Sequence, residues 1–195
     1  MARLPYLDKS DLAPENEDLL ARNITLYRAL AHSPNGLRAF GGLGQFIRYK
    51  SRLDPRLREL AILQVGYLAR APYEWSHHVK IGRNFGVTDD DIRALIAETE
   101  KRPSQLEPIA KHVLKAAREM TNDLAITQAT LRALATHLDN EHLVDLVITI
   151  SFYNAVVRLL ASLAIDVEPE YQKYLEAFPL PNPEVAFTHV HSASA

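Results

Sequence analysis

Apolar positions recur every three to four residues along most of this chain, and no segment shows the alternation of a half-buried strand. The fold class that follows is all-α, a helical bundle centred on a hairpin at about 54–85. The spacing predicts helices at about 15–31, 35–49, 54–71 and 73–85, and then at about 88–98, 108–122, 127–138 and 140–165.

Helix start and stop signals are clearest around the hairpin. Asp54-Pro55 combines an N-cap residue with a proline in the first turn, and Pro72 ends one helix and begins the next. Gly86 is the expected C-cap of the second helix, and Thr88 with the acidic residues 89–91 caps a short third one.

The domain organisation that we expect is simple. Residues 1–178 form one domain with its core motif at 54–98, and residues 179–195 form a proline-containing tail. The cluster Gly41-Gly42-Leu43-Gly44 lies inside a predicted helix, without a preceding strand and without dinucleotide-binding spacing. We therefore expect it to allow close helix packing or a kink rather than to bind phosphate.

Composition removes several classes of function. The 195 residues include no cysteine, which excludes disulfides, thiolate nucleophiles and dithiol redox cycles. A net charge of −2 gives no basic field for a nucleic-acid partner. The most apolar stretch, Leu143 to Ile165, contains Asp145, Asn154 and Arg158, which favours a core helix over a membrane span. Without a signal-peptide pattern at the N-terminus, we expect a cytoplasmic protein.

Candidate chemistry is concentrated on the hairpin. Residues three and four apart share a helix face, so Glu74 lies beside both His77 and His78. A carboxylate next to an imidazole is an acid/base pair, because each group shifts the pKa of the other. Glu59 lies on the preceding helix, within reach of the same region.

The hairpin resembles the carboxymuconolactone decarboxylase and AhpD-like family. The block Arg58-Glu59-Leu60-Ala61-Ile62-Leu63 matches the start of the family pattern. His78, the run Gly86-Val87-Thr88 and Ile92 match its end at the family spacing, with Gly82 in place of a small alanine. The resemblance implies an AhpD-like all-α fold and a homo-oligomer, commonly a trimer or hexamer.

The chain departs from the peroxidase branch of this family at both cysteine positions, which fall on Ala71 and Glu74. Neither residue can form a disulfide, so the resemblance is to a cysteine-free branch, and thiol peroxidase activity by that route is excluded. What the resemblance carries over is a shared catalytic pocket of Glu59, Glu74 and His78.

These residues favour a cofactor-independent lyase, a decarboxylase or isomerase, acting on a small carboxylated or lactone substrate. Decarboxylation of a β,γ-unsaturated lactone acid, or migration of its double bond, needs a proton delivered to carbon and a cation beside the developing enolate. A protonated His78 held by Glu74 would supply both. Glu59 would orient the imidazole or act as the second acid/base group.

Three further residues are candidate substrate-binding groups. His77 points about 100° away from His78 and faces the pocket, a subunit contact or solvent. Tyr73 belongs to the pocket wall or to an interface. Arg158 shares a face of the most apolar helix with Asn154, and a buried arginine needs an anionic partner. That partner is either an acidic side chain or a substrate carboxylate.

No metal or cofactor is predicted. The Glu74-x-x-His77 spacing occurs in di-iron bundles, but the chain has no second Glu-x-x-His. The competing hypothesis is a non-catalytic oligomeric binding or scaffold protein that keeps the fold. In that case Glu74 and His78 would be sealed in a structural ion pair at a subunit contact.

Overall fold

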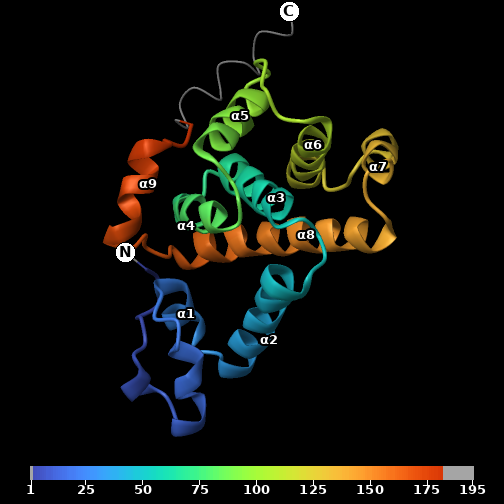
Figure 1. Ribbon diagram of the computed structural model, residues 1–195. Helices are drawn as coiled ribbons and strands as arrows, with labels where there is room; N and C mark the ends of the chain where they lie inside the picture. Colours follow the sequence, from blue (N-terminus) through green and yellow to red (C-terminus); the bar gives the residue numbers. More distant parts are fainter. Residues whose placement is uncertain (1, 182–195) are drawn as a thin grey trace, which may run out of the picture.

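The computed structural model describes residues 2–181, and within this range it is helical, without strands (Figure 1), which confirms the all-α prediction. The α-helices are α1 Thr25–Leu30, α2 Pro34–Gln45, α3 Pro55–Leu68, α4 Pro72–Asn84, α5 Asp89–Thr99, α6 Pro108–Asn122, α7 Gln128–Ala135, α8 Asn140–Leu163 and α9 Gln172–Ala177. Short 3₁₀ helices lie at Lys9–Asp11, Pro14–Leu20 and Pro169–Tyr171, and the π-helical turn η3, Phe46–Lys50, extends α2.

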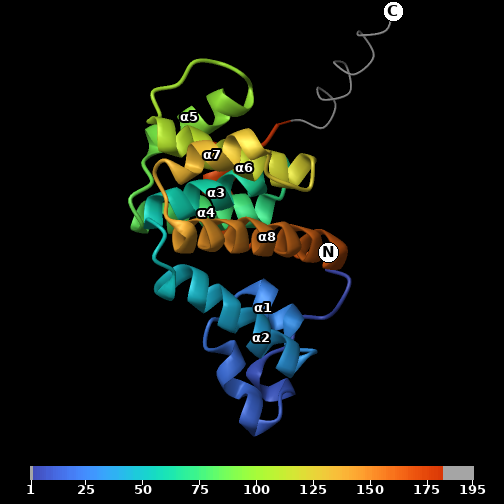
Figure 2. The ribbon, with the colours of Figure 1, turned by 90° about the vertical axis from the view of Figure 1, so that its right-hand side faces the viewer.

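The long helix α8 runs between two groups of helices. Helices α3 to α7 lie on one side of it, and the N-terminal helices α1 and α2 lie on the other (Figures 1 and 2). Helix α3 is the centre of the larger group and packs against α4, α6 and α8. Its residues 57–67 are all buried, which explains why apolar side chains occur on every side of the helix, with Arg58, Glu59 and Gln64 buried among them.

The expected caps are present. The Asp54 side chain accepts a hydrogen bond from the Leu57 amide, and Thr88 with Asp91 forms a complete capping box. Gly86 has a φ of +92°, a conformation that a residue with a Cβ rarely adopts, which explains a glycine at this helix end.

The prediction of one continuous helix at 15–31 is wrong. The segment forms the 3₁₀ helix Pro14–Leu20 and the separate helix α1, with Ile24 extended between them (φ −108°, ψ 149°). The break has a tertiary cause. The Thr25 amide and hydroxyl donate to Glu168 Oε1 at 2.8 and 2.9 Å. In a continuous helix the Thr25 amide would donate to a backbone carbonyl and would not be free to bind Glu168. Helix α9 was also not predicted.

The glycine cluster lies in α2, as expected. A Cβ built on Gly41 would meet the Tyr27 hydroxyl at 3.9 Å, and one on Gly44 would meet the Phe152 ring at 3.9 Å. These are ordinary packing distances, so the glycines bring α2 close to its neighbours without being sterically obligatory. The chain then enters the π-helical turn η3 directly after this cluster.

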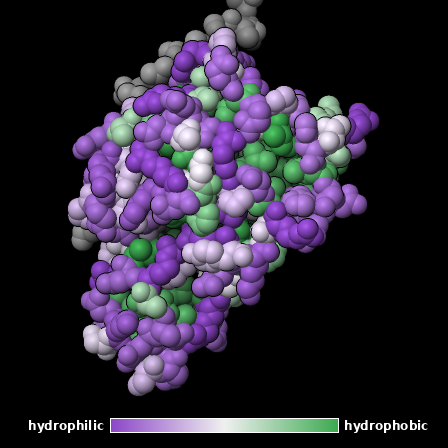
Figure 3. Space-filling view, viewed as in Figure 1, coloured by the Kyte–Doolittle hydropathy of each residue, from purple (hydrophilic) through white to green (hydrophobic). Residues whose placement is uncertain are grey.

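Helix α8 is long and apolar enough to cross a membrane, but 44% of its most apolar window is buried inside the protein. Its buried Asp145 accepts hydrogen bonds from the Ser51 hydroxyl and the Arg52 amide at 2.6 and 3.0 Å. These contacts agree with a core helix. In Figure 3 the visible surface is mostly polar, with apolar side chains gathered between α6 and α7 and again between α1 and α2.

The residues at the boundary between the predicted domain and the predicted tail pack on the body of the molecule. Phe178 is buried, and its carbonyl accepts a hydrogen bond from Trp75 Nε1 at 2.7 Å. Leu180 packs against the same core. The remainder of the predicted tail, residues 182–195 with Val185, Phe187, His189 and His191, lies outside the described residues.

Candidate functional site

The hairpin of α3 and α4 positions the three candidate catalytic residues. A Cβ on Gly82 would meet Val87 at 3.2 Å and the Cβ of Glu59 at 3.6 Å, so only a residue without a side chain fits here comfortably. Gly66 likewise lies against the backbone of Trp75. This close approach of the two helices brings Glu59 on α3 opposite His78 on α4.

His78 is held between two carboxylates. Its Nδ1 lies 2.7 Å from Glu59 Oε2 in a hydrogen bond, and its Nε2 lies 2.9 Å from Glu74 Oε1. The edge of its ring packs on Tyr153, with ring centres 5.0 Å apart and an interplanar angle of 82°. The side chain is 5% exposed, so the imidazole has a fixed orientation in a largely dry environment.

Glu59 is shared by two cations. Its Oε1 accepts hydrogen bonds from Arg58 Nε and Nη2 at 3.2 and 3.0 Å, while its Oε2 faces His78. The Arg58 guanidinium also lies over the Phe85 ring and donates to the Arg48 carbonyl at 3.1 Å. Orientation of the imidazole was one of the two roles expected for Glu59, and the structure shows the contact with His78; the ion pair with Arg58 is additional.

Glu74 is the least satisfied member of the cluster. Its side chain is 4% exposed, yet Oε1 accepts no hydrogen bond, because its 2.9 Å approach to His78 Nε2 lacks the required angle. Leaving a buried carboxylate oxygen without a full hydrogen bond is costly, and in native proteins such an atom calls for an explanation.

Electrostatics favours an imidazolium at His78. Burial alone would lower its pKa, but the negative charges of Glu74 and Glu59 and the hydrogen bond to Glu59 raise the pKa to about 9. Burial would raise the pKa of Glu59, but His78 and Arg58 together lower it. At neutral pH the pair is therefore an ionised carboxylate holding a protonated imidazole.

A cavity of about 570 Å³ opens beside the cluster, between the N-terminal helices and the hairpin. Glu74 and His78 line it together with Tyr73, His77 and Tyr153, whereas Glu59 lies behind His78 and does not. The cavity is large enough for a small organic acid or lactone. Positively charged side chains outnumber acidic ones along its wall, which contains Arg22, Arg38, Arg48 and Lys50 against Asp18 and Glu74.

His77 has different surroundings from His78. Its Nε2 lies 2.8 Å from Glu168 Oε2, and its ring is stacked between Tyr73 and Tyr171, with ring centres at 4.1 and 3.6 Å. Glu168 Oε1 also accepts hydrogen bonds from Thr25 and from the Tyr73 hydroxyl at 3.3 Å. We call His77, Glu168, Thr25, Tyr73 and Tyr171 the clasp, because they tie α4 to the N-terminal and C-terminal segments.

The clasp is saturated with hydrogen bonds. Burial would raise the pKa of Glu168, but the bonds from His77 and the Thr25 amide lower it to about 2. His77 and Tyr73 touch the cavity, as sequence reasoning allowed, but their polar atoms are directed to Glu168. Their evident role is to hold the cavity wall in place.

The expectation of a buried Arg158 is wrong. Arg158 is exposed and donates to the carbonyl and side-chain oxygens of Asn154 on its own helix, at 2.6 and 2.9 Å. It does not line the cavity. The predicted placement of Asn154 and Arg158 on one face of α8 is therefore correct, but Arg158 faces solvent.

Sequence reasoning missed Glu168 and Arg48. Glu168 is 91 residues from its partner His77, and no local pattern could have paired them. Arg48 lies in the π-helical turn η3 and lines the cavity. Its basic side chain among apolar and aromatic neighbours was the one available signal. Across residues 2–181 no group of three or more histidine and acidic side chains is arranged to hold a metal ion.

Comparison with known proteins finds a family that matches the hairpin and the residues around it. The sequence profile of the carboxymuconolactone decarboxylase family matches residues 34–119, which include Glu59, Glu74 and His78. The resemblance expected from the sequence is confirmed over these residues, and the chain contains no cysteine. Among curated proteins, none matches the sequence.

Solved structures share the fold at low identity. An AhpD-core, uncharacterised peroxidase-related protein from Ralstonia eutropha JMP134 is 18% identical over 89% of this chain and 95% of its own, with a TM-score of 0.73. A cysteine-to-alanine variant of the debrominase Bmp8, in complex with 2,3,4-tribromopyrrole, is 19% identical over 90% of this chain and 98% of its own, with a TM-score of 0.72. A peroxidase-related protein from Silicibacter sp. TM1040 is 19% identical over 74% and 76%, with a TM-score of 0.62. At these identities the likeness establishes the AhpD-like fold.

Proposed function

Starting from a chain whose residues 34–119 match the carboxymuconolactone decarboxylase family, we propose that Glu59, His78 and Glu74 perform cofactor-independent acid/base chemistry. The reaction class is that of a lyase, a decarboxylase or isomerase, on a small carboxylated or lactone substrate. The observation that carries this proposal is Glu74 Oε1, a buried oxygen without a hydrogen bond in the wall of a cavity.

Each residue has a defined task in this proposal. Glu74, which lines the cavity, exchanges a proton with a substrate carbon through its carboxyl group. The His78 imidazolium supplies positive charge beside the enolate that forms, and Glu59 keeps the imidazole protonated and oriented. In an isomerisation, Glu74 removes a proton from one carbon and returns it to another. In a decarboxylation, carbon dioxide leaves, its bonding electron pair enters the enolate, and protonated Glu74 delivers the proton that solvent later replaces.

The test is a screen of β,γ-unsaturated lactone acids with the purified full chain in D₂O, followed by NMR. We expect deuterium incorporation at carbon, with or without loss of carbon dioxide. Glu74→Gln and His78→Ala should each lower the rate by about 10²–10⁴-fold. The matched control is Glu141→Gln, since Glu141 is paired with Arg52 on the surface and lies outside the cavity wall.

Full activity in both cluster variants would contradict the assignment. The competing hypothesis is a non-catalytic oligomeric binding or scaffold protein. One observation supports it, the buried chain of ion pairs that joins Arg58, Glu59 and His78. That hypothesis expects the variants to lower the melting temperature while no lactone acid is turned over.

Other properties implied by the family stay predictions. We propose a homo-oligomer, a trimer or hexamer, in the cytoplasm, without a nucleic-acid or membrane partner. Light scattering coupled to gel filtration would determine the oligomeric state directly.

A further inference from the structure

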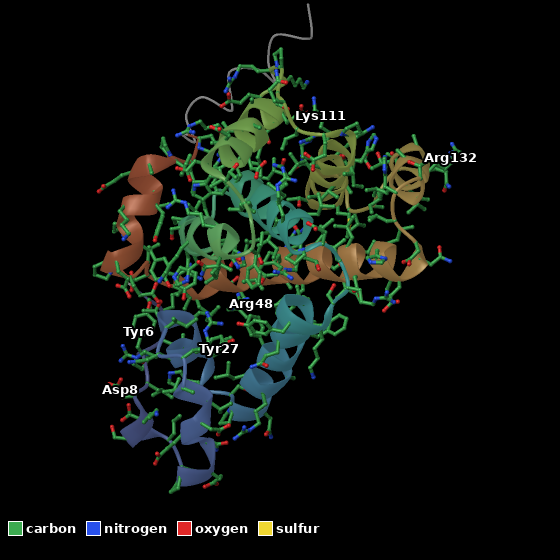
Figure 4. The ribbon with its side chains drawn as sticks, viewed as in Figure 1. Tyr6, Asp8, Tyr27, Arg48, Lys111 and Arg132 are labelled. Carbon is green, nitrogen blue, oxygen red and sulfur yellow. The ribbon has the colours of Figure 1, made fainter. Side chains whose placement is uncertain are left out.

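Arg48 is a cavity residue that the acid/base mechanism does not use. The turn η3 places it at the junction of the N-terminal helices with α8 and α4, close to Tyr27 in the view of Figure 4. Its Nε is fully buried and has no hydrogen-bond partner. Among the described residues it forms no salt bridge with an acidic side chain. π-Helical turns often occur at functional sites, where they redirect a side chain.

The other cations of the cavity wall are accounted for. Arg38 is held by Asp18 through two hydrogen bonds at 2.8 and 2.9 Å. Arg22 and Lys50 are exposed, so water can solvate them, and Arg22 lies over the Tyr27 ring. Arg48 alone in this set combines a half-buried side chain with an unpaired nitrogen.

Arg48 is also fixed relative to the catalytic cluster. Its carbonyl accepts a hydrogen bond from Arg58 Nη1, and Arg58 in turn binds Glu59, the partner of His78. Burial lowers the pKa of Arg48, but Tyr153 and Glu59 outweigh this effect and raise it, so the side chain stays a cation. By formal charge, the three cationic groups Arg48, Arg58 and His78 are grouped with two carboxylates, Glu59 and Glu74. The site therefore has an excess of one positive charge, which an anionic ligand would neutralise.

We infer that Arg48 binds the carboxylate of the substrate and thereby selects anionic lactone acids over neutral lactones. A guanidinium recognises a carboxylate through two parallel hydrogen bonds, and Arg48 lines the cavity without an acidic partner among the described residues. Bound in this way, the acid would lie across the cavity with its ring toward Glu74 Oε1 and His78. This assignment gives Arg48 the anion-binding task that sequence reasoning considered for Arg158, and it rests on the proposed function.

Binding of a non-reacting probe tests the inference without requiring turnover. The probes are γ-carboxy-γ-butyrolactone, a saturated lactone acid, and its methyl ester, titrated into the full chain by NMR. We expect the wild-type chain to bind the acid at least about tenfold more tightly than the ester. Arg48→Met should weaken acid binding by about tenfold or more and leave ester binding unchanged, and Arg48→Lys should lie between the two.

The matched control is Arg22→Met, which removes an exposed cation from the same cavity and should change acid binding by less than about threefold. Equal binding of acid and ester, no acid binding by the wild-type chain, or wild-type acid affinity in Arg48→Met would each overturn the inference. The comparison of acid and ester binding uses the wild-type chain alone. The inference can therefore be tested even if Arg48→Met does not fold.

The outcome is separable from that of the proposed function. If acid binding depends on Arg48 but no unsaturated lactone acid is converted, the anion site stands and the lyase assignment fails. If Glu74→Gln abolishes turnover while Arg48→Met leaves KM and acid binding unchanged, the lyase assignment stands and the anion site fails.

Discussion

The cluster around His78 and the clasp around His77 are adjacent on α4, and each joins a buried imidazole to a carboxylate. In the clasp, both oxygens of Glu168 accept hydrogen bonds, and the His77 ring is covered on both faces. In the cluster, Glu74 Oε1 accepts none, and the cavity lies beside it. A histidine–carboxylate pair is therefore not in itself evidence of catalysis. An unsatisfied atom with space for a ligand is what separates the two regions.

The difference follows from how each pair contributes to stability. The clasp connects α4 to Thr25 and Tyr171, which lie far away in the sequence, so its hydrogen bonds close the tertiary structure. The cluster instead concentrates charge within the α3–α4 hairpin. Fully satisfied polar networks make a structure rigid, whereas partly satisfied ones are kept where function requires them.

The largest effect should come from breaking the cluster at Glu59. Glu59→Gln leaves Arg58 buried without its anionic partner, and we expect a loss of about 3–5 kcal/mol in the free energy of unfolding. The measurement is urea denaturation followed by circular dichroism. Glu168→Gln is the matched change in the clasp and should cost less, because Glu168 is only partly buried and Gln can still accept from Thr25. An equal cost for both would remove the distinction.

Breaking the clasp should rank second. His77→Ala removes a hydrogen bond to a carboxylate and the ring between two tyrosines, so we expect a loss of about 2–4 kcal/mol. Thermal unfolding would measure it. On the lactone acid found by screening, turnover well below the melting temperature should fall far less than in His78→Ala. A rate loss as large as that of His78→Ala would place His77 in the chemistry.

The pH dependence should differ between the two regions. The pKa of His78 is raised to about 9, so its contribution to stability is complete below its ordinary pKa of 6.5 and is lost as the pH rises through about 9. Turnover that needs the imidazolium should then fall about tenfold per pH unit. Rate measurements from about pH 6 to about pH 11 would show this limb. Glu59→Gln should move it to lower pH.

The clasp should lose stability at acid pH rather than at alkaline pH. The pKa of Glu168 is lowered to about 2, so its contribution is complete above the ordinary value of 4.5 and is lost as the pH falls toward about 2. Glu168→Gln should therefore flatten the acid side of a stability profile and leave the alkaline side unchanged. The reverse result would contradict the assignment of the clasp.

The smallest effect should come from stacking within the clasp. Tyr171→Leu keeps the bond between His77 and Glu168 but removes the ring 3.6 Å from the imidazole, and we expect a cost of about 0.5–1.5 kcal/mol beyond lost area. Tyr174→Leu is the control, since that ring contacts Tyr171 in a tilted arrangement, with ring centres 6.1 Å apart. Chemical denaturation of both variants would resolve the difference, and equal costs would remove the stacking contribution.

Sequence reasoning was most reliable where structure depends on neighbours along the chain. The caps at Asp54 and Thr88 and the glycine at 86 were predicted because each meets a need of the local backbone. The pairing of Glu74 with His78 follows from helix geometry alone. Glu59 was added by family resemblance, and the structure brings it to His78.

Predictions failed where distant segments decide the outcome. The helix expected at 15–31 breaks because Thr25 bonds to Glu168, which no local pattern could indicate. Arg158 was expected to be buried because its helix is apolar, but only packing determines which part of α8 faces solvent.

The sequence by itself determined most of the helices, the caps at Asp54 and Thr88, the absence of thiol chemistry and an acid/base pair on one helix face. Tertiary structure alone decided that His77 is saturated, that Glu74 keeps a free oxygen, and that Arg48 enters the cavity unpaired. The physical reason is that caps and periodicity act over a few residues of backbone. Desolvation and hydrogen-bond satisfaction depend instead on every segment packed around an atom.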